Sequence, residues 1–183
     1  MTERVDPVVA PNTMTEWRRW LRANHAAAQG VWLRFPGRSV AKMPIGYDEA
    51  VEEALCYGWI DGQLKPIDDR SSMIRFTPRR AGSHWARSNR DRAERLIAVR
   101  RMKPAGLAKV EAAKRDGSWS MLEAVERLEV PPDLRRALGA RGVRRFAALT
   151  NGKKREHLYA LVTAKRPATR AKRIEAIVAS LRP

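Results

Sequence analysis

Residues 59–77 have the sequence WIDGQLKPIDDRSSMIRFT, and this stretch decides the fold of the first half of the chain. Two runs inside it, Trp59–Ile67 and Ser72–Thr77, carry β-branched and aromatic residues that favour strands. The polar residues Asp68–Ser71 between them are typical of a turn. The pattern therefore predicts a β-hairpin with a four-residue turn, whose first strand begins beside the end of the second.

Two helices and one further strand are expected before the hairpin. Residues 13–16 form a capping box with Thr13 as N-cap, and the helix that follows should end near Gly30. Residues 31–35 alternate in the manner of a strand. Residues 48–57 have the pattern of a second helix. The first half is therefore expected to be α+β, a small antiparallel sheet with covering helices.

Helical patterns continue from residue 83 to the end of the chain. Ser83 is expected to cap a helix that runs through Arg101, and Pro104 opens the next helix, which ends at Gly117. Asn151 is expected to cap a later helix. The helices expected in the C-terminal segment cover residues 133–139, 142–149, 152–164 and those from 167 onward.

The length of 183 residues suits one large or two small domains. An acidic connection over residues 118–132 is the predicted boundary, because it separates two helical stretches and contains two consecutive prolines. We therefore expect an α+β domain over residues 12–117 and a helical C-terminal domain over residues 131–183.

Composition and motifs exclude several classes of protein. Every apolar run is shorter than the roughly 20 residues of a membrane span, and residues 1–11 lack the apolar region of a signal peptide. The single cysteine, Cys56, excludes an intramolecular disulfide framework, and the three histidines are too scattered for a metal site. Because no phosphate-binding glycine motif occurs either, no cofactor is predicted. A soluble cytoplasmic protein is the expectation.

Positive charge is concentrated in two blocks of the chain. The 37 basic and 20 acidic residues give a net charge of +17. Residues 1–78 are neutral, whereas residues 79–115 carry +9 and residues 135–183 carry +12. Such an excess predicts attraction to a polyanion such as nucleic acid. The alternative is a composition bias that favours arginine.

One dense polar cluster is the candidate site of the sequence. The hairpin would place Asp61 near residues 77–80, where a carboxylate facing guanidinium groups makes charge-assisted hydrogen bonds. The arginines could hold a phosphate or carboxylate ligand; the alternative is an ion pair that only joins the sheet edge to the next helix. The ligand-binding residues predicted on this basis are Asp61, Arg75, Thr77, Arg79, Arg80, Ser83, Trp85 and Asn89.

Two further features have both a functional and a structural interpretation. Trp85 and Trp119 lie in or near the basic blocks, where an RNA-binding protein would stack bases on them, and burial is the alternative. Cys56 lies near the C-terminal end of the helix predicted over residues 48–57, where the partial negative charge of the helix tends to raise a thiol pKa. We therefore expect a small buried apolar residue and not a nucleophile.

Several short stretches resemble the YdeI/OmpD-associated bacterial family. They are Trp20-Leu21, Asn24-His25, residues 31–33, residues 47–50, Cys56-Tyr57-Gly58-Trp59-Ile60-Asp61-Gly62, Phe76-Thr77-Pro78-Arg79-Arg80 with Ser83 and Trp85, and Met102 with residues 104–107. In the C-terminal part they are Phe146, Arg155-Glu156, residues 164–167 and Thr169-Arg170.

This resemblance implies a link to bacteriocin protection, antimicrobial-peptide resistance or an outer-membrane porin. It implies no reaction, cofactor or catalytic residue. Together with the residues, it predicts a non-catalytic cytoplasmic binding or stress-protection protein with a polyanion or protein partner. Two alternatives stay open: a nucleic-acid-binding protein that uses residues 79–115 and 135–183, and an anion site or enzyme around Asp61 and Arg79.

Overall fold

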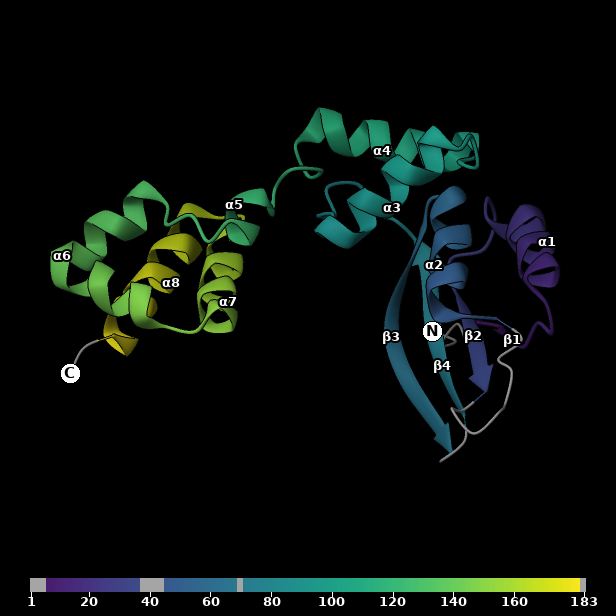
Figure 1. The fold of residues 1–183 in the computed structure, drawn as a ribbon, viewed down its shortest axis with the longest axis horizontal. Coiled ribbons are helices and arrows are strands. Elements are labelled where there is room, and N and C mark those ends of the chain that lie inside the picture. Colours follow the sequence, from purple (N-terminus) through teal and green to yellow (C-terminus); the bar gives the residue numbers. More distant parts are fainter. Residues whose placement is uncertain (1–5, 37–44, 69–70, 182–183) are drawn as a thin grey trace. The chain divides into compact units, whose positions relative to one another are not determined.

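The computed structural model describes residues 6–36, 45–68 and 71–181 of the 183. Contacts within the chain divide it into two compact units, shown in Figure 1. The first unit comprises residues 1–83 and 88–116, and the second comprises residues 84–87 and 117–183. The fold is α+β, as predicted, because the sheet lies in the first unit and the second is built from helices.

Four strands form one sheet in the order β1-β2-β4-β3. Their bounds are β1 Val8–Val9, β2 Val31–Pro36, β3 Trp59–Asp68 and β4 Ser71–Pro78. The predicted hairpin is confirmed, since Trp59 pairs with Pro78 and Asp61 with Phe76. Residues 69–70 of its predicted turn lie outside the described residues. The sheet is mixed and not purely antiparallel, because the short strand β1 pairs in parallel with β2.

One face of the sheet forms the core of the first unit. Side chains alternate along a strand, so Val31, Leu33 and Phe76 share a face and are fully buried. Trp17 of α1 (Met14–Asn24) packs edge-on against Phe76, with ring centroids 5.4 Å apart. The next helix, α2 (Tyr47–Cys56), lies against the sheet and contacts β3 (Figure 1).

Helix α1 begins as predicted and ends earlier than predicted. The Thr13 hydroxyl accepts a hydrogen bond from the Glu16 amide at 3.2 Å, which makes Thr13 the N-cap. The helix ends at Asn24 and not near Gly30, because the chain turns toward β2 over residues 25–29. Gly30 has another role: a Cβ there would lie 2.4 Å from an Asp6 carboxylate oxygen, so a larger residue would displace the Asp6 side chain.

Two helices complete the first unit, α3 (Arg87–Ala98) and α4 (Pro104–Asp116). The start and end predicted for α4 are confirmed, and Gly117 follows it at φ 80°. The prediction that Ser83 caps α3 is wrong, because that helix begins at Arg87. The residues between belong to the second unit, where the Trp85 amide donates to the Ser118 carbonyl at 3.3 Å.

The second unit is a small helical bundle around an apolar cluster that includes Leu134, Phe146 and Leu161. Its helices are α5 Glu123–Glu126, α6 Pro132–Ala148, α7 Asn151–Val162 and α8 Pro167–Ser180. The two short helices predicted before residue 150 are confirmed: α6 consists of two helical segments joined by a kink at Gly139, whose φ of 60° and ψ of 179° are not helical. Thr150, and not Asn151, caps α7, since its hydroxyl accepts from the Lys153 amide. None of the helices in the described part of the chain is long and apolar enough to cross a membrane.

Candidate functional site

A cavity of about 610 Å³ lies in the first unit, bordered by α1, the end of α2 and the start of α4. Its wall carries five basic or histidine side chains, and none of the described residues lining it is acidic. We call it the cationic cavity. It is lined by Thr15, Arg18, Arg19, Arg22, His25, Tyr57, Lys103, Pro104 and Ala105.

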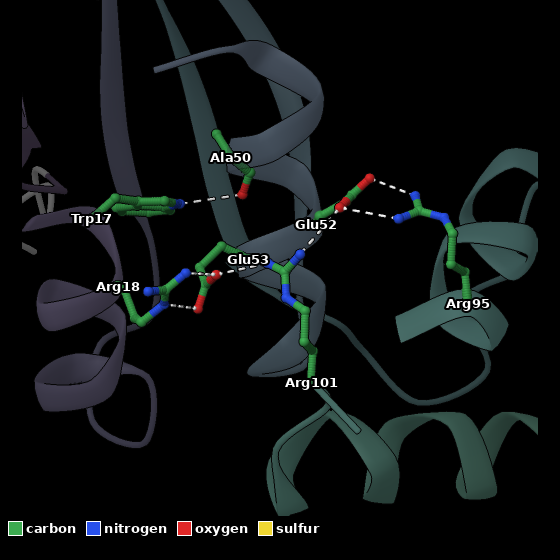
Figure 2. A network of polar contacts seen from close by, with 7 residues as sticks. All are labelled: Trp17, Arg18, Ala50, Glu52, Glu53, Arg95 and Arg101. Atoms are coloured by element: carbon green, nitrogen blue, oxygen red, sulfur yellow. Dashed lines mark hydrogen bonds and ion pairs between the residues drawn. The ribbon is translucent and has the colours of Figure 1, made fainter. Parts of the chain in front are cut away.

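A buried carboxylate behind this wall holds Arg18 in place (Figure 2). The Arg18 Nε and Nη2 atoms donate to the two oxygens of Glu53 at 2.9 and 3.0 Å. The Glu53 side chain is only 3% exposed, whereas the Arg18 side chain is 49% exposed. These bonds raise the pKa of Arg18 above its ordinary value. Because the bidentate contact fixes one edge of the guanidinium, its remaining donors are preorganised for a ligand.

Two neighbouring carboxylates of α2 connect the surrounding helices. Arg101 Nη2 donates to Glu53 at 3.1 Å, and its Nη1 lies 3.7 Å from Glu52. Arg95 of α3 donates to the same Glu52 carboxylate (Figure 2). Through these pairs α2 is joined to α1, to α3 and to the segment that leads into α4, so the walls of the cationic cavity are held by one network.

An aromatic pair forms another part of the wall. The His25 and Tyr57 rings lie with their centroids 5.1 Å apart at an angle of 53°. His25 Nδ1 lies 3.0 Å from the Leu21 carbonyl oxygen, and because that oxygen can only accept, Nδ1 is the donor in this hydrogen bond. Burial raises the pKa of Tyr57, and this phenol therefore stays neutral at physiological pH. The wall thus combines cationic side chains with apolar ring surface.

The first turn of α4 closes the cavity and approaches α2 closely. The Lys103 amide donates to the Cys56 carbonyl at 3.0 Å. A Cβ at Gly106 would lie 2.4 Å from the same carbonyl oxygen, so glycine permits this approach. The positive end of the α4 dipole adds to the charge of the nearby cations, which favours an anion.

Cys56, at the end of α2, does not supply a nucleophile. Its side chain is buried, and burial followed by the negative charge of Glu53 raises the pKa of the thiol to about 11. A thiol with that pKa is protonated near neutral pH and reacts slowly. The expectation of a small buried apolar residue is confirmed.

The structure brings Asp61 and Arg79 together, with Arg79 buried and Asp61 only half-buried. The Asp61 carboxylate accepts a hydrogen bond of 2.6 Å from the Tyr47 hydroxyl. Burial, followed by this bond, raises the pKa of Tyr47 to about 12. Arg79 is 4% exposed, and burial lowers its pKa to about 10, while the attraction of Asp61 acts in the opposite direction. Ligand binding by these two residues stays a prediction.

Three other predicted residues line a second cavity of about 490 Å³. Arg75, Thr77 and Arg80 share its wall with Asp6, whose carboxylate accepts from Arg75 Nε at 2.6 Å. We call it the polar cavity, and residues 26–29 and Pro78 complete its wall.

The last three predicted residues do not gather around that cavity. Ser83 is partly buried in the first unit, and Asn89 accepts from Arg92 Nη1 at 3.2 Å. Trp85 belongs to the second unit, where it is 2% exposed and its ring centroid lies 4.9 Å from that of Trp119. The structure therefore supports the burial interpretation of Trp85. Among the described residues, no group of three or more metal-ligating side chains could hold a metal ion.

The residues of the cationic cavity were not predicted from the sequence. One signal could have pointed to them: Arg22 lies three residues after Arg19 and four after Arg18, so these arginines gather on the polar side of α1, away from the buried Trp17 and Leu21. The partners Tyr57 and Lys103 come from distant parts of the chain, and only the fold brings them to this helix.

Comparison with known families gives two matches that divide the chain. Residues 9–109, which form most of the first unit, match the family described as "Domain of unknown function (DUF8412)". The chain belongs to this family. Residues 127–182 match the family described as "Bacteriocin-protection, YdeI or OmpD-Associated", which confirms the resemblance for the C-terminal segment.

The cationic cavity lies wholly within the part of the chain that matches DUF8412. The N-terminal motifs that resemble the YdeI/OmpD-associated family, including residues 56–62 and 76–80, also fall within this match and not within the C-terminal one. No curated protein and no solved structure matches the chain.

Proposed function

We propose that this is a non-catalytic cytoplasmic binding protein of the YdeI/OmpD-associated type, whose first unit binds a small anion with an apolar body. The cationic cavity carries this proposal: four cations and a histidine meet there at a wall whose described residues include no acid. Its volume of about 610 Å³ suits a small organic ligand. Preorganised arginines favour a carboxylate or phosphate group, and the Tyr57 ring suits an apolar body.

The name of the C-terminal family suggests a protective role, and we include resistance to bacteriocins or antimicrobial peptides in the proposal. Direct capture of a cationic peptide is disfavoured, because a protein with a net charge of +17 repels it. An anionic ligand, in contrast, is attracted by this positive charge. We therefore propose that protection depends on binding of an anionic ligand and not on sequestration of the peptide.

The proposal is tested by calorimetric titration of the full chain with phenyl phosphate and, separately, with inorganic phosphate. Arg22→Gln and Lys103→Gln each remove a cation from the wall, and Arg100→Gln removes an exposed arginine that does not line the cavity. A charge-assisted hydrogen bond contributes about 1.5–3 kcal/mol, so each wall variant should weaken binding about tenfold or more. Equal binding by all three variants and the native chain would refute the assignment.

Nucleic-acid binding by residues 79–115 and 135–183 stays a second candidate. It is favoured by the exposure of Arg135, Arg136 and Arg141 on α6. Other arginines of the second unit have structural partners: Arg145 donates to the Leu181 carbonyl, for example. An electrophoretic shift of duplex DNA that disappears with rising salt would support this candidate, and no shift at low salt would end it.

A further inference from the structure

The sheet has a second face that the helices α1 and α2 do not cover in the described part of the chain. Register places Val8, Trp32 and Arg75 in one row across β1, β2 and β4. The next row contains Arg34, Met73 and Lys65. These residues alternate with the buried core positions of the same strands, so they point to the opposite side. We call this side, together with Ile60 and Thr77, the open face.

Burial distinguishes the two faces sharply. Val31, Leu33 and Phe76 of the core face are 0% exposed. On the open face, Val8 is 58% exposed and the Arg75 side chain 38%. Trp32 is partly exposed, whereas a tryptophan placed only for packing would be expected on the core side. The open face therefore presents aromatic surface to solvent.

The charge of the open face is positive. Arg34 and Lys65 are exposed, and Arg75 contributes a third cation. Two acids of the described residues border these rows: Asp6, which already pairs with Arg75 at 2.6 Å, and the exposed Asp68, which lies opposite Ser71 in the following row. A surface with this excess attracts a polyanion and repels a second copy of itself.

The polar cavity lies at the end of the open face and shares Arg75 with it. The Asp6–Arg75 pair rests directly on the backbone at Gly30, where a Cβ would lie 3.0 Å from Arg75 Nη2. This contact holds the guanidinium beside Thr77 and the exposed Arg80. A cavity with two guanidinium groups and a hydroxyl, next to an aromatic ring, matches the phosphate and base of a nucleotide.

We propose that the open face binds single-stranded nucleic acid, with a base stacked on Trp32 and a neighbouring phosphate at Arg75 and Arg80. A single strand is favoured over a duplex because its bases are free to stack on a protein ring. The site is independent of the cationic cavity. The proposed site also differs from the nucleic-acid site predicted from the charge count, because it lies on the sheet and not on the basic helices.

The test is fluorescence anisotropy of the full chain with a fluorescein-labelled 12-nucleotide single-stranded RNA and a duplex of the same length, over a range of salt. Trp32→Ala should weaken single-strand binding about tenfold or more, while Trp32→Phe keeps a stacking ring and should retain most of it. Arg34→Ala should weaken binding and reduce the slope of log affinity against log salt by about 0.7. The matched control is Arg127→Ala, which removes one exposed arginine that lies outside the sheet and outside residues 79–115 and 135–183, and it should change single-strand affinity by less than about twofold.

Urea midpoints of all variants establish that they are folded. Should Trp32→Ala not fold, Arg34→Ala and Trp32→Phe still decide the question, because neither removes core volume from the buried face. Unchanged affinity in folded Trp32→Ala and Arg34→Ala would overturn the proposal, as would an equal loss of affinity in Arg34→Ala and the Arg127→Ala control. Equal affinity for the single strand and the duplex would mean attraction by charge alone and would also overturn it.

Discussion

Replacement of Glu53 by glutamine perturbs the network behind the cationic cavity with little change in volume. The carboxylate accepts three hydrogen bonds, two from Arg18 at 2.9 and 3.0 Å and one from Arg101 at 3.1 Å. A glutamine keeps one oxygen, and its amide group would point donors at the guanidinium donors, so about two bonds are lost. Hydrogen bonds to charged groups contribute about 1.5–3 kcal/mol each.

Exposure of the two arginines reduces this loss. Their side chains are 49% and 42% exposed, so water solvates them once Glu53 no longer does. We therefore expect Glu53→Gln to lower the free energy of unfolding by about 2–3 kcal/mol, less than the 3–5 kcal/mol that follows when a fully buried charge is orphaned. With a urea dependence of about 1.5 kcal/mol/M, the unfolding midpoint should fall by about 1 to 2 M.

The assay is urea unfolding followed by tryptophan fluorescence, to which the first unit contributes four of the six tryptophans. Glu52→Gln is the matched control on the same helix. Its main partner Arg95 is more exposed than either arginine of Glu53, so solvent screens the pair and the loss should be clearly smaller. The reasoning is refuted if Glu53→Gln is no more destabilising than Glu52→Gln.

Three further predictions follow from single contacts. Gly106→Ala places a Cβ against the Cys56 carbonyl and should lower the free energy of unfolding by about 1–3 kcal/mol in thermal or urea unfolding. Gly152→Ala, whose Cβ would meet only the Thr150 hydroxyl at 4.0 Å, should be neutral or stabilising. Equal effects of the two variants would contradict the close approach of α4 to α2. Cys56 should resist alkylation at pH 8 in the native chain and react once urea unfolds it, because burial holds its pKa near 11; fast native labelling would argue against burial. Hydrogen bonds from Arg170 hold the pKa of Asp133 below its ordinary value of 3.8. As the pH falls, Asp133 is therefore protonated in the unfolded chain before it is protonated in the folded chain. The contribution of the pair is thus present above about pH 4 and lost as the pH falls through the folded pKa, and Asp133→Asn should flatten the acid dependence of unfolding; an unchanged acid dependence would mean that the pair contributes nothing.

Local patterns were sufficient to predict most of the elements. The hairpin follows from two alternating runs around a polar turn, and the start of α1 from Thr13 and its partner three residues on. Strand β1 has only two residues, too few for any periodicity, and its parallel pairing depends on where β2 lies. The start of α3 was misplaced because Ser83 has the chemistry of a cap, while burial of Trp85 in the second unit determines the path of the chain.

The candidate site was harder to predict than the fold because its contacts join distant segments. Arg18 and Glu53 are 35 residues apart, and nothing in either local sequence indicates that they meet. The predicted cluster depended on the hairpin, because a hairpin is the long-range pairing that a local sequence pattern can indicate. That prediction correctly placed residues 59–61 beside residues 76–78. The sequence gives the number of basic residues but not which of them face a ligand. Arg145, for example, donates to the Leu181 carbonyl at the end of α8, whereas the basic residues of α1 line the cationic cavity.

The central claim, that the cationic cavity binds a small anion, is tested most directly by an NMR titration of ¹⁵N-labelled full chain with phenyl phosphate. Binding should shift the amide signals of Arg18, Arg22, Tyr57 and Ala105 together along one saturable isotherm, and Lys103→Gln should weaken that isotherm about tenfold. Shifts confined to the second unit, or shifts that grow linearly without saturation, would contradict it.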